Sequence, residues 1–422
     1  MNIKTNKKLH LKAKQKFSHE DLIKLIKKTK STYLGIIKNL PTLSDILKAR
    51  KFIPSSSLYG NRYGKNVSAL FDVRKKGVMD FYVTDDSGIL SNSVTNNESA
   101  RERISKAKKS GKRIIYFFGG STMMGMGART PDFSIPALVE KILFEDYGEK
   151  TICINFGIGG SESKVDLNLL IFDALNIATP DSVVFYNGWN CCSYGSITNL
   201  LREQFIDDSK LLLFNGENLR QVEYNLILKD LYSLKYFFKR SIVLTIASIF
   251  SVLYNVFNNS FFHRIIFAIQ NRIINLRPSE TSQTLLKQID FKKKNIIKTS
   301  KQVAKEYNFI QEYADAICKS KGIEFYNVFQ PLVFYGNKKL TKNERKWRDT
   351  AYSSFNSDLY YNFHKNLLLE INKGSNRNFF DCTLCFDDTK DEVYIDSGHL
   401  NRLGNVIVSE HISSFITKND SK

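Results

Sequence analysis

Residues 113–121 of this chain read Arg113-Ile114-Ile115-Tyr116-Phe117-Phe118-Gly119-Gly120-Ser121. The five apolar and aromatic residues in the middle predict a strand buried on both faces, because a strand with one solvated face alternates apolar with polar residues. Two glycines and a serine then break the pattern and predict a sharp turn. A strand buried in this way is typical of a parallel sheet covered by helices.

Strands and helices alternate along the chain after this stretch. The pattern predicts strands over Thr151 to Asn155, Ser182 to Tyr186 and Ile323 to Val328, and helices over Ile135 to Tyr147, Lys164 to Ala178 and Arg402 to Thr417. Such alternation places helices on both faces of a parallel sheet. The sequence therefore predicts an α/β fold with three layers, α/β/α.

The 422 residues divide into an extension and one large domain. Residues 1–110 predict a helical and loop-rich N-terminal extension, with helical periodicity over 18–50 and a polar stretch rich in Gly, Asn and Ser over 59–110. Residues 111–420 predict the α/β domain, which carries a largely helical insertion over about 195–320.

The chain is basic, with 62 Lys and Arg against 42 Asp and Glu and a formal net charge of +20. A positive field of this kind favours polyanions or an acidic membrane surface. The basic residues are spread along the whole chain, however, and form no basic stripe with interleaved stacking aromatics. We therefore expect a diffusely solvated basic surface and no nucleic-acid partner.

The N-terminal residues and the cysteines bear on the cellular compartment. Met1 to Lys8 is basic but leads into no apolar stretch of about 7–15 residues like that of a signal peptide, which predicts a cytoplasmic protein. Six cysteines in such a chain predict reduced thiols and no disulfide framework. The Cys382-Thr383-Leu384-Cys385 motif lacks a second pair, so it predicts packing and no metal site.

Ser241 to Phe262 is a segment of 22 residues without a charge, bounded by basic residues. Three interpretations stay open: a buried or lid helix, a helix lying in a membrane interface, and a membrane span. A span would place Ser121 and His399 on opposite sides of the bilayer, so we expect the segment not to cross. Peripheral association with the inner membrane face agrees with this expectation.

Polar or glycine-rich residues follow three of the predicted strands. Ser121, Gly160 and Asn190 each come just after the carboxyl end of a strand. Open α/β sheets bind ligands at this edge, so the three residues are expected to lie together.

A serine nucleophile needs a neighbouring imidazole to accept its proton. Of the six histidines, His399 has an acid, Asp396, at a fixed close spacing before a predicted helix. The carboxylate can fold back to orient the imidazole. The N–H groups of Ser121 and Gly160 and the Asn190 amide would then meet the negative charge of an attacked carbonyl.

Each of these fragments also has a structural interpretation. Gly119-Gly120-Ser121 fits an ordinary turn or a phosphate-binding loop, although it lacks the ending of a P-loop and the GxGxxG of a dinucleotide site. Trp189, beside Asn190, fits either the core or the wall of a pocket.

The four fragments, Gly119 to Ser121, Asn155 to Gly160, Gly188 to Asn190 and Asp396 to His399, resemble the blocks of the SGNH hydrolases, also called the GDSL family. The family's blocks contribute Ser, Gly, Asn and His in this order. The resemblance implies a flavodoxin-like three-layer fold and acyl transfer without a cofactor or metal. It assigns Ser121 as nucleophile, His399 as base, Asp396 as its partner, and Ser121, Gly160 and Asn190 as oxyanion donors.

Two residues depart from the family pattern. Gly120 stands where the family has an aspartate before the serine, and Cys191 stands where it has an aspartate after Asn190. Neither position supplies a catalytic atom in the mechanism above.

The leading hypothesis is a serine esterase or O-acyltransferase that acts on an acylated carbohydrate or glycan through an acyl-enzyme intermediate. The alternative is a non-catalytic carbohydrate-binding or membrane-associated scaffold of the same fold. A phosphate-handling enzyme is a third reading, which lacks an accompanying lysine or a set of metal-binding carboxylates.

Overall fold

The structure is a computed structural model that describes residues 5–14, 67–72, 78–85, 89–93, 98–193, 195–196, 293–350, 357–373 and 378–420. The helical pattern predicted over 18–50 and the uncharged segment 241–262 lie outside the described residues. In the described ranges, no helix is both long enough and apolar enough to cross a membrane.

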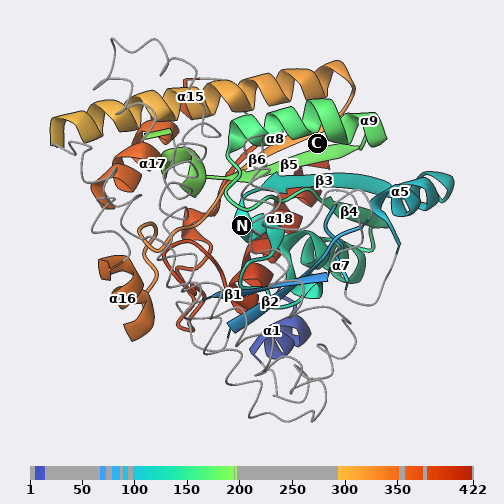
Figure 1. Ribbon diagram of the computed structural model, residues 1–422, viewed down its shortest axis with the longest axis horizontal. Helices are drawn as coiled ribbons and strands as arrows, with labels where there is room; N and C mark the ends of the chain where they lie inside the picture. The colour runs from blue at the N-terminus through green and yellow to red at the C-terminus, as the bar shows by residue number, and fades with distance from the viewer. Residues whose placement is uncertain are drawn as a thin grey trace, which may run out of the picture.

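A parallel sheet of five strands forms the centre of the protein (Figure 1). Its strands are β3 (Arg113–Gly119), β4 (Thr151–Asn155), β5 (Ser182–Asn187), β6 (Glu324–Phe329) and β7 (Phe379–Asp381). They lie side by side in the order β4-β3-β5-β6-β7. Numbered along the chain, this order is 2-1-3-4-5, the flavodoxin-like order of doubly wound sheets.

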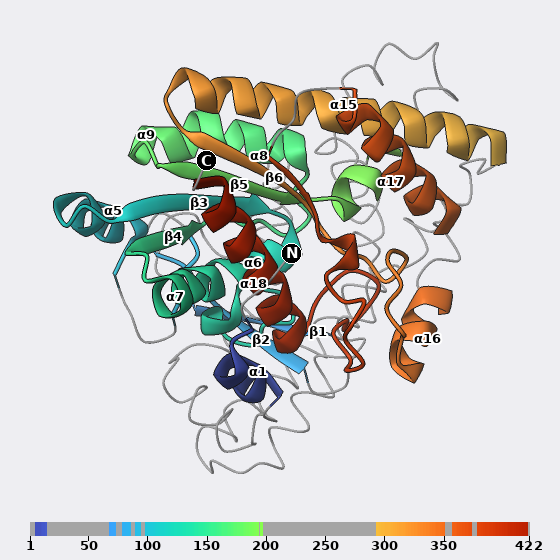
Figure 2. The ribbon, with the colours of Figure 1, turned by 180° about the vertical axis from the view of Figure 1, so that it is seen from behind.

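Helices cover both faces of this sheet (Figures 1 and 2). One face carries α7 (Ile135–Tyr147) and α18 (Arg402–Asp420), with α1 (Lys7–Lys14) packed against α18. The other face carries α5 (Ala100–Lys109), α8 (Ser163–Leu169) and α15 (Lys293–Ser320). The predicted three-layer α/β/α fold is confirmed.

The side chains of β3 show why the sheet needs both layers. Ile115 and Phe117 pack into the core under α7 and α18, whereas Tyr116 and Phe118 pack into the core under α8 and α15. Successive strand residues point to opposite faces, so a run of apolar residues needs an apolar layer on each side.

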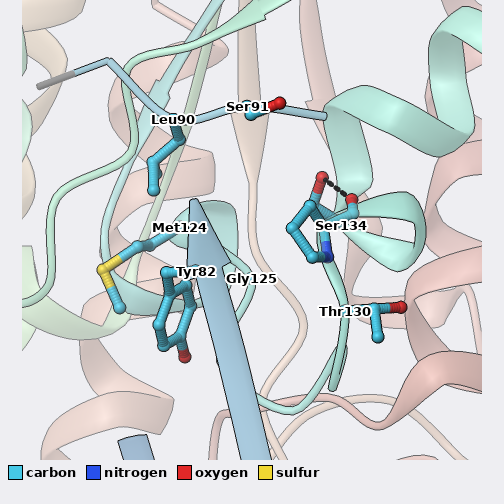
Figure 3. A pocket seen from close by; sticks show the side chains of 8 residues that line it. Tyr82, Leu90, Ser91, Met124, Gly125, Thr130 and Ser134 are labelled. Carbon is cyan, nitrogen blue, oxygen red and sulfur yellow. Dashed lines mark hydrogen bonds between the residues drawn. The ribbon is translucent and has the colours of Figure 1, made fainter. Parts of the chain in front are cut away.

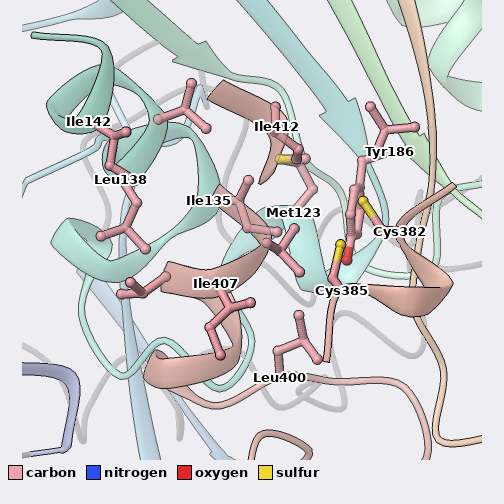
Figure 4. Packing of buried hydrophobic residues seen from close by; sticks show 14 of the residues in the cluster. Met123, Ile135, Leu138, Ile142, Tyr186, Cys382, Cys385, Leu400, Ile407 and Ile412 are labelled. Carbon is pink, nitrogen blue, oxygen red and sulfur yellow. The ribbon is translucent and has the colours of Figure 1, made fainter. Parts of the chain in front are cut away.

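Two cysteines of the CxxC motif belong to the first of these cores. Cys382 and Cys385 are buried there, and Figure 4 shows their sulfurs beside the ring of Tyr186. All six cysteines of the chain are free thiols and buried.

The remaining elements surround the carboxyl end of the sheet or connect its strands. They are α6 (Ser121–Met124), η2 (Pro131–Phe133), η3 (Leu170–Ala174), α9 (Leu175–Ile177), α16 (Lys342–Thr350), α17 (Ser357–Ile371) and η5 (Cys382–Leu384). The helix predicted over 164–178 is therefore α8 continued by a π-helical turn, η3, and the short α9. α17 packs on α15 and β6 and adds a third apolar cluster at that end.

The prediction of a loop-rich stretch over 59–110 was wrong in two places. Strands β1 (Val67–Asp72) and β2 (Val78–Val83) pair as an antiparallel hairpin, and α5 follows with a capping box between Ser99 and Glu102. A two-stranded hairpin has a weak sequence pattern, because it needs no continuous apolar run. The mainly polar composition of α5 concealed its buried face, which consists of Ala100, Ile104 and Ala107.

Candidate active site

The structure brings the four sequence fragments together at the carboxyl edge of the sheet. Ser121 is the first residue of α6, directly after β3, and Asn190 lies in the helical turn 189–193 after β5. Because β3 and β5 are neighbours in the sheet, their carboxyl ends lie side by side. In a doubly wound sheet of this order, the strand order reverses between these two strands, and ligands bind at this point.

Ser121 and His399 meet across the whole domain, 278 residues apart in the sequence. The Oγ of Ser121 lies 2.6 Å from Nε2 of His399. Both side chains are partly buried, so the pair is shielded without being closed off from a substrate. At this distance the two atoms form a hydrogen bond, through which the hydroxyl proton can pass to the imidazole.

Asp396 holds the other side of the same imidazole. Its Oδ2 lies 2.7 Å from Nδ1 of His399, and its Oδ1 accepts the backbone N–H groups of Gly398 and His399, each at 2.9 Å. The carboxylate is 2% exposed. A buried carboxylate bonded in this way keeps the proton of the imidazole on Nδ1 and leaves Nε2 as the acceptor.

Gly120 lies against Asn190 of the third fragment and against Ser161, which directly follows the second fragment. A Cβ built on this residue would lie 2.5 Å from Nδ2 of Asn190 and 3.4 Å from the carbonyl oxygen of Ser161. A side chain would displace the Asn190 amide, which donates to the Ser161 carbonyl at 2.8 Å. Glycine at position 120 leaves room for the Asn190 amide in this position.

Asn155 begins the second fragment and has a structural role in its turn. Its Nδ2 donates to the carbonyl of Met123 at the end of α6, and its Oδ1 accepts the N–H of Gly157. Asn155 is 1% exposed. It therefore joins the turn that leads to Gly160 to the helix that begins at Ser121.

Trp189 forms part of the wall of the site. A Cβ on Gly398 would lie 1.5 Å from Cε3 of the indole, so the ring rests directly on this glycine. The Trp189 ring centroid is 5.7 Å from that of His399. Trp189 is partly exposed beside His399 and also packs against the third apolar cluster, so its position has features of both interpretations left open by the sequence.

The loop that carries Asp396 and His399 is anchored by a residue that the sequence analysis missed. Glu344 of α16 is fully buried; its Oε1 accepts the N–H groups of Val393 at 2.9 Å and Tyr394 at 3.3 Å. Its Oε2 bonds to the buried ammonium of Lys338 at 2.8 Å. Nothing in the sequence around Glu344 distinguishes it from the solvated charges of the same helix.

A second buried carboxylate lies behind the site, on α8. Asp166 accepts the hydroxyl of Ser161 at 2.5 Å and the amide of Asn187 at 2.9 Å. Burial raises the pKa of Asp166 to about 7, although these two hydrogen bonds act in the opposite direction. The charge of Glu162 also raises the pKa of Asp166. The charge of Asp166 raises the pKa values of Cys191 and Tyr307.

This raised pKa predicts a pH-dependent stability. An unfolded Asp titrates near pKa ~3.9, so the stability that Asp166 contributes is complete below about pH 4 and is lost as the pH rises through about 7. Relative to Asp166→Asn, we expect the wild-type free energy of unfolding to fall by about 2–4 kcal/mol over this range and then to stay level. Urea unfolding of both proteins, followed by circular dichroism at several pH values, measures the difference; a constant difference contradicts the expectation.

A small cavity behind α6 is separate from the predicted site residues (Figure 3). Tyr82 and Met124 line it together with Ser134, whose hydroxyl donates to the carbonyl of Pro131 at 2.7 Å. Its volume of about 10 Å³ has room for about one water molecule, which is too small for a substrate.

No protein-family model matches the chain, and no curated protein matches it either. Solved structures similar to it include a two-domain esterase active on acetylated mannans, with 14% identity, a TM-score of 0.33 and 76% of this chain covered. This chain spans 54% of the length of that esterase. An acetyl xylan esterase, AlAXEase, has 12% identity and a TM-score of 0.33, with 71% of this chain and 98% of that chain covered.

A third similar structure is a putative lipolytic protein of the G-D-S-L family from Desulfitobacterium hafniense DCB-2. It has 9% identity and a TM-score of 0.33, with 72% of this chain and 99% of that chain covered.

Proposed function

We propose that this protein is a serine esterase of the SGNH type that acts on an acylated carbohydrate. The observation that carries the proposal is the chain of contacts from Ser121 Oγ to His399 Nε2 at 2.6 Å and from His399 Nδ1 to Asp396 at 2.7 Å. Serine, imidazole and carboxylate in this order activate a hydroxyl for acyl transfer.

In the first half of the reaction, Ser121 Oγ attacks the carbonyl carbon of the ester while His399 Nε2 accepts its proton. Asp396 stabilises the imidazolium that forms. The intermediate breaks down when the alcohol leaves with the proton from His399, and the acyl group stays on Ser121.

The negative charge on the attacked oxygen is assigned to three donors: the N–H groups of Ser121 and Gly160 and the side-chain amide of Asn190. A side-chain amide has two N–H groups, and one of those of Asn190 bonds to the Ser161 carbonyl at 2.8 Å. The bond fixes the plane of the amide, and the second N–H serves the oxyanion.

The second half of the reaction decides between hydrolysis and transfer, since water or an acceptor hydroxyl can take the acyl group from Ser121 by the reverse proton path.

Trp189 supports a carbohydrate as substrate, because a partly exposed indole beside the base can pack against the apolar face of a sugar ring. The cytoplasmic location of the protein stays a prediction from the sequence.

Labelling with a fluorophosphonate tests the proposed nucleophile. We expect one equivalent of label on wild type, mapped by peptide mass spectrometry to Ser121, and labelling slowed by at least about 10²-fold in His399→Ala, because the hydroxyl then lacks its base. Ser320→Ala, a change at the exposed end of α15, should label like wild type. Absence of label on Ser121 in folded wild type would favour the non-catalytic scaffold.

A further inference from the structure

Asp166 is a buried carboxylate that the reaction described above does not use. It is fully buried in α8, and removing a carboxylate from water is unfavourable unless hydrogen bonds replace the lost solvation. Its two oxygens each receive one donor, the Ser161 hydroxyl at 2.5 Å and the Asn187 amide at 2.9 Å. The identity of these two partners indicates what the carboxylate does.

Both partners adjoin proposed oxyanion donors. Ser161 directly follows Gly160, and its carbonyl oxygen accepts the amide of Asn190 at 2.8 Å. Asn187 is the last residue of β5, three positions before Asn190. One carboxylate therefore joins the turn that carries Gly160 to the strand end that carries Asn190.

The beginning of α8 makes a second contact with the same region. The N–H of Ser163 donates to the sulfur of Cys191 at 3.3 Å, and the Ser163 hydroxyl lies 3.1 Å from that sulfur. Gln311 of α15 donates to the same hydroxyl at 2.9 Å. Burial raises the pKa of the Cys191 thiol to about 12, so a neutral thiol accepts this N–H where the SGNH pattern has an aspartate.

We propose that Asp166 is a positioning residue of the oxyanion hole, which holds the Gly160–Ser161 turn and the end of β5 in one geometry so that the Gly160 and Asn190 donors stay aligned. This inference rests on the proposed esterase function. Asp166 contacts neither the nucleophile nor the base in the described contacts, so it acts through Ser161 and Asn187. A misaligned oxyanion donor weakens transition-state binding more than ground-state binding.

Kinetics with p-nitrophenyl acetate test this role. In Asp166→Ala we expect kcat to fall about 10–100-fold while KM changes less than about 3-fold. Asp166→Asn should stay within about 5-fold of wild type, since a carboxamide of the same shape can accept from Asn187 and donate to the Ser161 hydroxyl. Ser161→Ala removes a single bond of the network and should lower kcat in the same direction by a smaller factor.

A double-mutant cycle separates positioning from general destabilisation. If Asp166 acts through the oxyanion donors, adding Asp166→Ala to Asn190→Ala should lower kcat by a smaller factor than Asp166→Ala does in wild type, because one of the two donors that Asp166 aligns is already gone. Asp85→Ala is the matched control: Asp85 is also buried and also accepts two hydrogen bonds, in its case from the backbone N–H groups of Ile89 and Ala100. It should lower the melting temperature and leave kcat within about 2-fold.

Equal losses of kcat from Asp166→Ala in both backgrounds would overturn the inference, as would a loss in Asp166→Asn as large as in Asp166→Ala. Crystal structures of the two variants supply a readout that needs no activity. The Asn190 amide should leave the Ser161 carbonyl in Asp166→Ala and keep this bond in Asp166→Asn; an unmoved amide in both variants would refute the role. Failure of the proposed function would give a different result: the folded wild-type protein would not hydrolyse esters.

Discussion

Replacing Ser121 by alanine should lower kcat/KM for p-nitrophenyl acetate by at least about 10³–10⁴-fold. The variant loses the atom that attacks the ester, and no acyl-enzyme can form. His399 and the oxyanion donors remain, so a small residual rate above the hydrolysis of this reactive ester in buffer should persist.

The fold should tolerate this change. Ser121 is the first residue of α6, and its hydroxyl bonds to the side chain of His399 and to no core group in the described contacts. The melting temperature should therefore stay within a few degrees of wild type, and Ser320→Ala should retain full activity. Wild-type rates in Ser121→Ala would exclude the assigned nucleophile.

Replacing Asp396 by asparagine should be nearly as damaging, with an expected loss of about 10³–10⁴-fold in kcat/KM, the size known for this change in serine proteases. The carboxylate accepts from three N–H donors: two backbone groups on Oδ1, and His399 Nδ1 on Oδ2. Asparagine has a single oxygen, which satisfies the two backbone donors best. Its NH₂ group then faces Nδ1 and selects the imidazole tautomer with the proton on Nε2.

In that tautomer Nε2 can no longer accept the proton of Ser121, so the loss should appear in kcat and in the rate of fluorophosphonate labelling. Asp391→Asn is the matched control, because Asp391 is an exposed carboxylate in an ion pair with Lys14 near the same loop. Its effect on kcat should stay within about 2-fold, since exposed ion pairs contribute little. Equal activity of Asp396→Asn and wild type would remove Asp396 from the mechanism.

The sheet and its helical layers could be predicted because their signals are local. A run such as Ile114 to Phe118 has no alternative to burial on both faces, and the structure buries all five residues. The hairpin of β1 and β2 and the strand β7 were missed, because segments of only three to six residues are too short to show a clear strand pattern.

The buried acids behind the site were not predictable from the sequence. Glu344 bonds to Val393, 49 residues away, and Asp166 bonds to Asn187, 21 residues away. A carboxylate in a helix has the same sequence pattern whether it faces water or the interior. Whether such a carboxylate is buried, and which residue it bonds to, depends on how α16 and α8 pack in the fold. The neighbouring residues in the sequence do not show this.

The sequence by itself determined which side chains stand at the carboxyl ends of the strands, since a residue after a buried strand must emerge at the edge of the sheet. It also determined that Asp396 can reach His399, because three residues of loop span that distance. Only the tertiary structure decided that His399 meets Ser121, 278 residues away, and that Asp166 lies behind the proposed oxyanion donors. Those contacts depend on how β3, β5, α8 and α18 pack together, because packing acts between segments far apart in the chain.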